Sequence, residues 1–122
     1  LIDAPCSGLG TLRRDPDLKW HRRQADLPGL VNAERALLAE GARAVRRGGR
    51  LVYATCSSEP EENQDVAHAF LDTHPGFRRA GPSAAWAEEP LALLVTPEGW
   101  MQTAPERHGL DAFFAAAFTR VD

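Results

Sequence analysis

The sequence predicts a mixed α/β fold with a mainly parallel sheet, because strand-like and helix-like segments alternate along the chain. Residues 1–3 and residues 50–54 are short apolar runs, which is typical of strands buried on both faces. Residues 28–46 lie between them and repeat apolar residues at near-helical spacing. A single right-handed helical crossover would place the two strands side by side.

The first helix is expected over residues 28–46. Pro28 suits the first turn of a helix, and Gly48 with Gly49 supplies a stop after its end. The apolar and small residues that recur at near-helical spacing are Leu30, Leu37, Leu38, Gly41, Ala42 and Val45. These six positions are expected to form the inner face of the helix.

A second helix is expected from Ser58 to about Thr73. Ser58 and Glu61 stand three residues apart and are expected to form a capping box, with Pro60 in the first turn. The side chains expected to face inward are those of Val66, Ala69 and Phe70.

Beyond residue 76 the pattern is weaker. Residues 81–90 are interpreted as a loop, and residues 91–95 as a possible strand. Residues 100–103 and 112–120 are expected to form a pair of strands near the C-terminus.

The composition excludes several classes of protein. The chain has 122 residues, enough for one domain, and its 43% apolar and 25% charged residues are typical of soluble globular proteins. No apolar run approaches the roughly 20 residues that cross a bilayer, so no membrane partner is expected. Two cysteines are too few for a disulfide framework, and the histidines show no ligand spacing, so no metal is expected. We expect a cytoplasmic protein with both thiols reduced.

The first residues indicate a longer polypeptide. Leu1-Ile2-Asp3 has the character of the end of a buried strand, and a strand this short is not stable alone at the edge of a sheet. We therefore expect these residues to continue a chain that begins further upstream.

Two groups of reactive residues follow the two predicted strands. Asp3 and Cys6 come at the end of the first strand, and Cys56 follows the second. In open α/β sheets ligands bind at the carboxyl ends of the strands, so neighbouring strands would turn both thiols toward one crevice. Taken singly, a free cysteine is more often a small buried hydrophobe, and Asp3 could merely cap its loop. The pattern alone leaves a reactive and a structural interpretation open.

A basic segment follows the first of these groups. Residues 13–23 hold five basic and two acidic residues, a net charge of +3, so the remainder totals −6 within the net charge of −3. The five basic residues are Arg13, Arg14, Lys19, Arg22 and Arg23. Such a segment could contact phosphates, or it could be a solvated surface. Trp20 could stack on a base or pack against the protein, and packing is the favoured interpretation.

Several motifs give the chain a family resemblance. They are Asp3-Ala-Pro-Cys-Ser-Gly-Leu-Gly10, Arg13-Arg14-Asp-Pro-Asp-Leu-Lys-Trp20 and Tyr53-Ala-Thr-Cys-Ser-Ser-Glu-Pro-Glu-Glu-Asn63. Together with residues 105–114 they resemble the Sun/nucleolar-protein family of RNA cytosine-5 methyltransferases, most of all the bacterial members that act on small-subunit ribosomal RNA. The chain departs from the family pattern at Gln64, Leu110 and Ala112, where the family usually has Glu, Thr and Gly.

The resemblance implies a fold and a cofactor. The fold would be the C-terminal half of a Rossmann-like methyltransferase sheet, with parallel strands and an antiparallel strand near the C-terminus. Residues 1–122 would then be part of a catalytic domain whose N-terminal cofactor-binding half is missing, and this part alone is expected to be inactive. The implied cofactor is S-adenosylmethionine, with Asp3 and Pro5 among the residues that bind it.

The resemblance also implies a mechanism and a partner. Cys56 would be the nucleophile that adds to carbon 6 of cytosine, and Cys6 would assist release of the product. Asp3 would contact ring nitrogen 3 and the exocyclic amine of the base. The implied partner is RNA, ribosomal RNA in particular, with its phosphates bound by the five basic residues of segment 13–23.

Two other functions stay open at this point. A DNA cytosine-5 methyltransferase would use the thiol of its Pro-Cys motif, here Cys6, as the nucleophile. A catalytically silent RNA-binding module would use neither thiol. Comparing the Cys56→Ala and Cys6→Ala variants separates the two kinds of methyltransferase.

Overall fold

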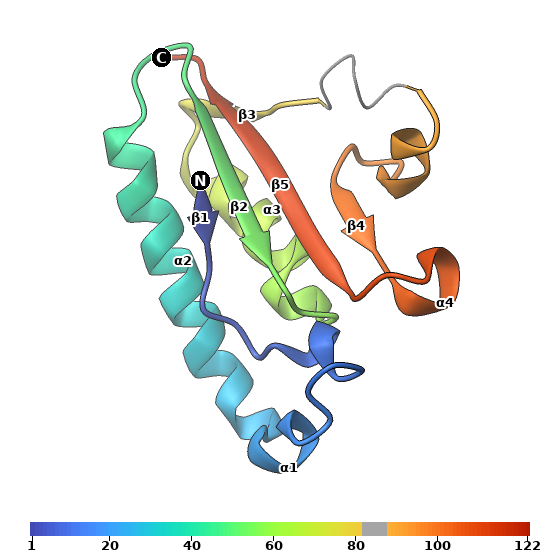
Figure 1. The fold of residues 1–122 in the computed structure, drawn as a ribbon. Coiled ribbons are helices and arrows are strands. Elements are labelled where there is room, and N and C mark those ends of the chain that lie inside the picture. The colour runs from blue at the N-terminus through green and yellow to red at the C-terminus, as the bar shows by residue number, and fades with distance from the viewer. Residues whose placement is uncertain (82–87) are drawn as a thin grey trace.

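Within residues 1–81 and 88–122, the part that the computed structural model describes, a five-stranded sheet organises the chain (Figure 1). The strands are β1 (Ile2–Asp3), β2 (Arg50–Thr55), β3 (Phe77–Arg79), β4 (Met101–Thr103) and β5 (Phe113–Arg120). Their order is β1-β2-β5-β3, and β4 pairs with β5 further along the edge that β3 occupies.

The strand directions confirm the predicted sheet. β1 pairs with β2 in parallel, whereas β5 is antiparallel to β2, β3 and β4. Four strands therefore run in one direction, and only the last of the described strands runs against them. The expected pairing of the two C-terminal strands is present as β4 with β5. The two strands that carry the cysteine loops are indeed neighbours, joined through one long helix.

Two helices cover one face of this sheet. They are α2 (Leu27–Ala44) and α3 (Gln64–Thr73), and Figure 1 shows α3 behind β2 and β5. Alternate residues of β2 and β5 point toward the helices, because successive side chains of a strand face opposite sides. The core between the layers contains Leu38, Ala42, Leu51, Tyr53, Val66, Phe70, Trp100, Phe114 and Phe118. Two shorter helices complete the fold. The helix α1 (Leu18–His21) lies on the side of the carboxyl ends of β1 and β2, and α4 (Pro105–His108) lies beside β4.

The long helix differs from its prediction in its end and in its inner face. α2 ends at Ala44, because Val45 has an extended backbone. Glu34, Leu38 and Ala42 are buried, whereas Leu37 is 41% exposed. Residues four apart lie on one stripe of a helix, so the sheet selects this stripe and leaves Leu37 about 100° away from it. A glutamate thus occupies a core position that the sequence did not predict.

The capping box predicted for the second helix is wrong. The Ser58 hydroxyl donates a hydrogen bond to the carboxylate of Glu59 at 2.8 Å, and it caps no helix. A 3-10 turn (Pro60–Glu62) comes first, and α3 begins only at Gln64. The reason is tertiary: the turn directs the side chain of Glu62 into the protein, where it binds residues of both cysteine loops.

Residues 91–95, a predicted strand, form a 3-10 helix (Leu91–Leu94) instead. Only Val95 makes a bridge to Met101. The physical reason is that β3 and β4 already occupy the free edge of β5, so this segment bonds its backbone locally, for example from Ala92 to Glu88. The loop predicted for residues 81–90 lies largely outside the described residues, since 82–87 are not among them.

In the part of the chain that the structure describes, no helix combines the length and the apolar character needed to span a bilayer. The same described residues show no group of three or more histidine, cysteine and acidic side chains placed to hold a metal ion.

Candidate active site

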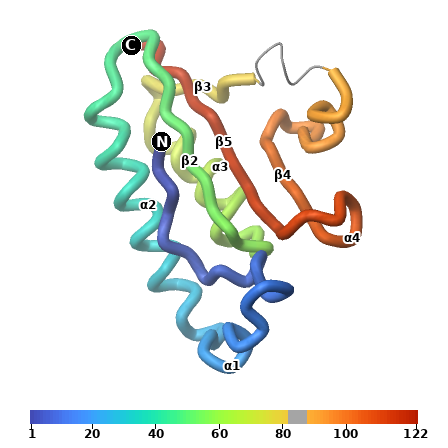
Figure 2. The backbone as a smooth tube through the Cα atoms, viewed as in Figure 1, coloured from blue at the N-terminus to red at the C-terminus, as the bar shows by residue number. Residues whose placement is uncertain are grey.

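Three segments that are distant in sequence meet at the carboxyl ends of β1 and β2 (Figure 2). Asp3 pairs with Ala54 in the sheet, so the loops that follow the two strands leave it side by side. Gly10 joins the third segment: its N–H donates to the carbonyl of Cys56 at 3.0 Å, and its carbonyl accepts from Ala112 at 2.9 Å. The first cysteine loop, the second cysteine loop and the segment before β5 therefore form one structural unit.

The two thiols lie next to each other in this unit. The Sγ atoms of Cys6 and Cys56 are 3.4 Å apart, within reach of an S–H···S hydrogen bond. Cys6 is buried, whereas Cys56 is half-buried. Burial raises the pKa of the Cys6 thiol to about 12, because an apolar environment disfavours the thiolate. Cys6 therefore keeps its proton at neutral pH, and Cys56 is the more accessible of the two.

Asp3 and Pro5, the predicted cofactor contacts, are exposed where the first loop leaves the sheet. The intervening Ala4 continues the strand pairing, since its N–H donates to the carbonyl of Ala54 at 2.9 Å. The Asp3 carboxylate therefore faces outward from a fixed backbone, beside the loop that carries Cys6. An exposed carboxylate can accept hydrogen bonds from the N–H or O–H groups of a ligand.

A buried carboxylate, that of Glu62, joins the two cysteine loops from behind. It accepts hydrogen bonds from the backbone N–H of Ser7 at 2.6 Å and from the Ser7 hydroxyl at 2.6 Å. The hydroxyl of Ser57 donates to the same carboxylate, and the two serine oxygens are 3.2 Å apart. Glu62 is fully buried. Little in the sequence indicates this buried role, because Glu62 is one of three acidic residues in the expected first turn of a helix, where acidic residues are common.

The second cysteine loop has further support from Asn63 and Tyr53. The Thr55 hydroxyl donates to Asn63 Oδ1 at 2.5 Å, and Asn63 Nδ2 donates to the carbonyl of Ser57 at 2.9 Å. The Tyr53 hydroxyl donates to the carbonyl of Glu62 at 2.6 Å. Burial raises the pKa of Tyr53, so this hydroxyl remains a donor. Both residues before and after Cys56 are thus held by buried hydrogen bonds.

A second buried acid, Glu34 of α2, lies beside this network. Burial and the charge of Glu62 raise the pKa of Glu34 to about 8. Within the described part of the chain, neither carboxylate oxygen of Glu34 has a hydrogen-bond partner. An unpaired buried carboxylate is costly, so Glu34 is neutral at pH 7. Its place on the stripe with Leu38 and Ala42 was the signal in the sequence that could have revealed it.

Glu34 makes stability depend on pH. Its pKa is raised from 4.5 to about 8 in the folded protein, so between these values the folded state keeps a proton that the unfolded state has released. The free energy of unfolding therefore falls as pH rises through this range and levels off above it. We expect Glu34→Gln to remove this term, which amounts to at most about 1.4 kcal/mol per pH unit. Denaturant unfolding of the intact polypeptide between pH 5 and 9 measures it.

The control for this experiment is Glu40→Gln, which removes a charge from an exposed position of the same helix. The Glu34→Gln variant should gain stability relative to wild type as pH rises, and the control should not. A stability difference between wild type and Glu34→Gln that stays constant from pH 5 to 9 would contradict a raised pKa at this site.

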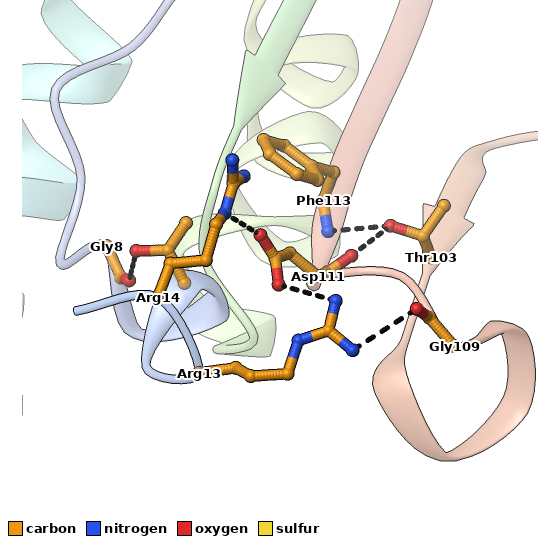
Figure 3. A network of polar contacts seen from close by, with 8 residues as sticks. Gly8, Arg13, Arg14, Thr103, Gly109, Asp111 and Phe113 are labelled. Atoms are coloured by element: carbon orange, nitrogen blue, oxygen red, sulfur yellow. Dashed lines mark hydrogen bonds and ion pairs between the residues drawn. The ribbon is translucent and has the colours of Figure 1, made fainter. Parts of the chain in front are cut away.

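Asp111 connects the basic segment to the segment before β5, as Figure 3 shows. Its buried carboxylate lies 3.3 Å from Nη2 of Arg13 and also pairs with Nε of Arg14. Arg13 donates a second bond to the carbonyl of Gly109 at 3.3 Å. The Asp111 carbonyl in turn accepts a bond from the hydroxyl of Thr103 at 2.6 Å. Arg13 and Arg14 therefore connect two segments of the chain, although their side chains are 60% and 68% exposed.

The other predicted RNA-binding residues differ in whether their side chains are hydrogen-bonded within the chain. Arg22 donates from Nε to the carbonyl of Ser7 at 2.9 Å, so it supports the loop of Cys6. Lys19 and Arg23 are exposed, and Nζ of Lys19 lies 4.8 Å from the ring centre of Trp20. Trp20 is 74% exposed, so the favoured interpretation that it packs against this chain is wrong. Trp20 belongs to the short helix α1, none of whose residues is buried.

The sheet, in which four of the five described strands run in one direction, has the Rossmann-like fold of methyltransferases such as the methyltransferase homolog protein from Pyrococcus horikoshii, which the chain matches with a TM-score of 0.73 at 29% identity. The family model described as 16S rRNA methyltransferase RsmB/F matches residues 1–119, and the chain belongs to this family. Methyltransferases of this family use S-adenosylmethionine.

Individual relatives agree with this assignment. The chain is 38% identical over 123 residues to the probable ribosomal RNA small subunit methyltransferase B of Bacillus subtilis, covering 98% of this chain and 27% of that protein. The crystal structure of PH0851 matches with a TM-score of 0.84 at 36% identity, covering 97% of this chain and 25% of the other. NSun6 from Pyrococcus horikoshii, solved with SFG, matches with a TM-score of 0.79 at 26% identity, covering 99% and 29%. The chain thus spans about a quarter of the length of these proteins.

Proposed function

We propose that this chain is the C-terminal catalytic part of an enzyme that methylates carbon 5 of a cytosine in RNA, with small-subunit ribosomal RNA as the substrate class. The observation that carries the proposal is the pair of thiols, whose sulfur atoms lie 3.4 Å apart at the ends of neighbouring parallel strands. Membership of a family of 16S rRNA methyltransferases supports RNA as the substrate. We propose that most of the cofactor site lies in a part of the polypeptide outside these residues.

Two thiols suit this reaction because of the chemistry of cytosine. Carbon 5 is a poor nucleophile, since it belongs to an aromatic ring. When a thiolate forms a bond to carbon 6, the electrons of the 5,6 double bond become available at carbon 5, which can then take a methyl group. Carbon 5 next loses its proton, the double bond re-forms and the sulfur leaves as a thiolate. Covalent catalysis of this kind divides one difficult step into easier ones.

Cys56 is proposed as the nucleophile, because it is the more exposed thiol and belongs to the Thr-Cys-Ser motif. Cys6 keeps its proton, since burial raises its pKa to about 12, and its S–H can donate a hydrogen bond to the thiolate of Cys56. The same sulfur lies beside the adduct when the carbon–sulfur bond must break. Cys6 is therefore proposed to assist release of the product.

Asp3 and Pro5 are the residues of this chain that we propose to contact S-adenosylmethionine, which supplies an electrophilic methyl group when bound. The exposed carboxylate of Asp3 accepts hydrogen bonds, so it can orient the cofactor or the exocyclic amine of cytosine. Its negative charge also favours protonation of ring nitrogen 3 as the thiolate adds.

We propose that the exposed cations of residues 13–23 bind phosphates of the RNA near this site. Lys19 and Arg23 are the most available, and the exposed ring of Trp20 next to Lys19 offers a surface on which a base can stack. Arg13, Arg14 and Arg22 also hold the loops together, so their replacement would affect both RNA binding and the site.

The decisive experiment is trapping with RNA that contains 5-fluorocytosine, carried out on the intact polypeptide with S-adenosylmethionine. Fluorine at carbon 5 cannot leave as the proton does, so the enzyme should remain bonded to the methylated base. We expect a protein–RNA adduct that survives denaturing electrophoresis, and we expect Cys56→Ala to form none. A DNA strand of the same sequence should give no adduct.

Each outcome of the trapping experiment discriminates between functions. An adduct on DNA but not on RNA would favour the DNA methyltransferase alternative. Absence of any adduct on ribosomal RNA, while the polypeptide binds the cofactor, would favour a silent RNA-binding module and would overturn the proposal.

A further inference from the structure

One buried side chain contacts both cysteine loops at equivalent positions. Glu62 binds Ser7, the residue after Cys6, through its backbone N–H and its hydroxyl, each at 2.6 Å. It also binds the hydroxyl of Ser57, the residue after Cys56. Each serine follows a cysteine in the chain, so the Glu62 carboxylate binds both loops one residue after a thiol.

The buried carboxylate of Glu62 is a hydrogen-bond acceptor for both cysteine loops. The side chain is fully buried, and taking a carboxylate out of water costs several kcal/mol, which its hydrogen bonds largely offset. An apolar residue would avoid that cost, but it would leave the buried donors of Ser7 and Ser57 without this acceptor. What the carboxylate adds is direction: two fixed oxygens accept three hydrogen bonds from two different loops.

The charge of Glu62 is not what the proposed reaction needs. A nearby negative charge disfavours the ionised form of an acidic group, and a nucleophilic thiol is such a group. Glu34 lies beside Glu62, and burial together with the charge of Glu62 raises the pKa of Glu34 to about 8. Any benefit of Glu62 to the chemistry must therefore come from where it holds the serines.

We propose that Glu62 is a positioning residue that sets the separation and orientation of Cys6 and Cys56. The inference rests on the proposed function for its consequence in catalysis, but its geometric part does not. The 3.4 Å contact between the sulfur atoms depends on two loops that are also connected by backbone hydrogen bonds at Ala4 and Gly10 and by the 3.2 Å contact between the hydroxyls of Ser7 and Ser57. Among the described residues, Glu62 is the one side chain that accepts hydrogen bonds from both cysteine loops. Without its carboxylate these three hydrogen bonds are lost.

The first test measures how readily the two thiols form a disulfide, which depends on their proximity and does not require methyl transfer. Diamide, which is reduced as two thiols are oxidised to a disulfide, is added to the intact polypeptide, and the linked Cys6–Cys56 peptides are quantified by mass spectrometry. We expect Glu62→Ala to slow this linkage about tenfold or more, while alkylation of Cys56 by iodoacetamide keeps its wild-type rate. The matched control is Glu61→Ala, an exposed residue of the same turn.

The second test separates position from charge by kinetics. Glutamine keeps an oxygen acceptor for the N–H of Ser7, and the serine hydroxyls can rotate to accept from its amide, so Glu62→Gln should preserve most of the geometry. We expect Glu62→Ala to lower kcat about 100-fold with KM for RNA within about twofold, and Glu62→Gln to recover most of the loss. If the charge itself mattered, glutamine and alanine would behave alike.

Ser57→Ala keeps the proposal testable if Glu62→Ala does not fold, because it removes one tether and leaves the carboxylate in place. It should slow the linkage of the thiols in the same direction as Glu62→Ala. Equal linkage rates in wild type and in the folded variants would overturn the positioning role. A wild-type protein that links its thiols rapidly yet traps no fluorinated RNA would instead overturn the proposed function and leave the geometric inference intact.

Discussion

Replacing Cys56 by alanine is expected to abolish methyl transfer, whereas replacing Cys6 by alanine is expected to leave the protein bonded to its RNA. Without the sulfur of Cys56 the carbon 6 adduct cannot form, and loss of an enzymatic nucleophile lowers kcat by about 10⁴-fold or more. Without Cys6 the adduct forms, but the neighbouring thiol 3.4 Å away is no longer there to assist its breakdown. Transfer of labelled methyl groups and denaturing gels of the protein–RNA adduct measure both effects in the intact polypeptide.

The double variant is the control for this comparison. Cys6→Ala combined with Cys56→Ala should form no adduct, which shows that the adduct in the Cys6 variant depends on Cys56. The opposite pattern, with an adduct in the Cys56→Ala variant and none in Cys6→Ala, would assign the nucleophile to Cys6. That result would favour the DNA type of cytosine methyltransferase.

The largest effect on structure is expected for Gly10→Ala. A Cβ atom at this position would lie 2.1 Å from the carbonyl oxygen of Ala112 and 2.7 Å from that of Cys56. Both are backbone atoms that cannot rotate away, so the methyl group must push the two segments apart and break the hydrogen bonds that Gly10 makes to them. Overpacking of this kind costs roughly 1–3 kcal/mol, and the two lost hydrogen bonds add about 1 kcal/mol each.

Denaturant unfolding of the intact polypeptide checks this prediction, and Gly29→Ala is its matched control. Gly29 lies in the first turn of α2, and a Cβ there would meet nothing within 4 Å. Because alanine is more stable than glycine in a helix, this change should stabilise the protein by about 0.5–1 kcal/mol. The two variants make the same chemical substitution with opposite expected signs. If Gly10→Ala did not lower the free energy of unfolding, the three segments would not approach each other as closely at Gly10 as the structure shows.

Local patterns in the sequence determined the framework of the site. The apolar run before Cys56, the helix before that run and the strand end at Asp3 predicted two neighbouring parallel strands, which the structure has. The motifs around Cys6 and Cys56 are contiguous stretches, so they can be recognised without any knowledge of the fold. The roles proposed for these residues stay predictions.

The surroundings of the thiols depend on contacts between residues that are far apart in the sequence. Ser7 and Glu62 are 55 residues apart in the chain, and Arg13 lies far in sequence from the buried Asp111, so no local pattern connects them. The sequence placed Glu62 in the first turn of a helix, where an acidic residue is usually exposed. The physical reason is that periodicity and capping depend on neighbours within a few residues. Burial of a charged group, by contrast, depends on which distant donors the fold brings to it.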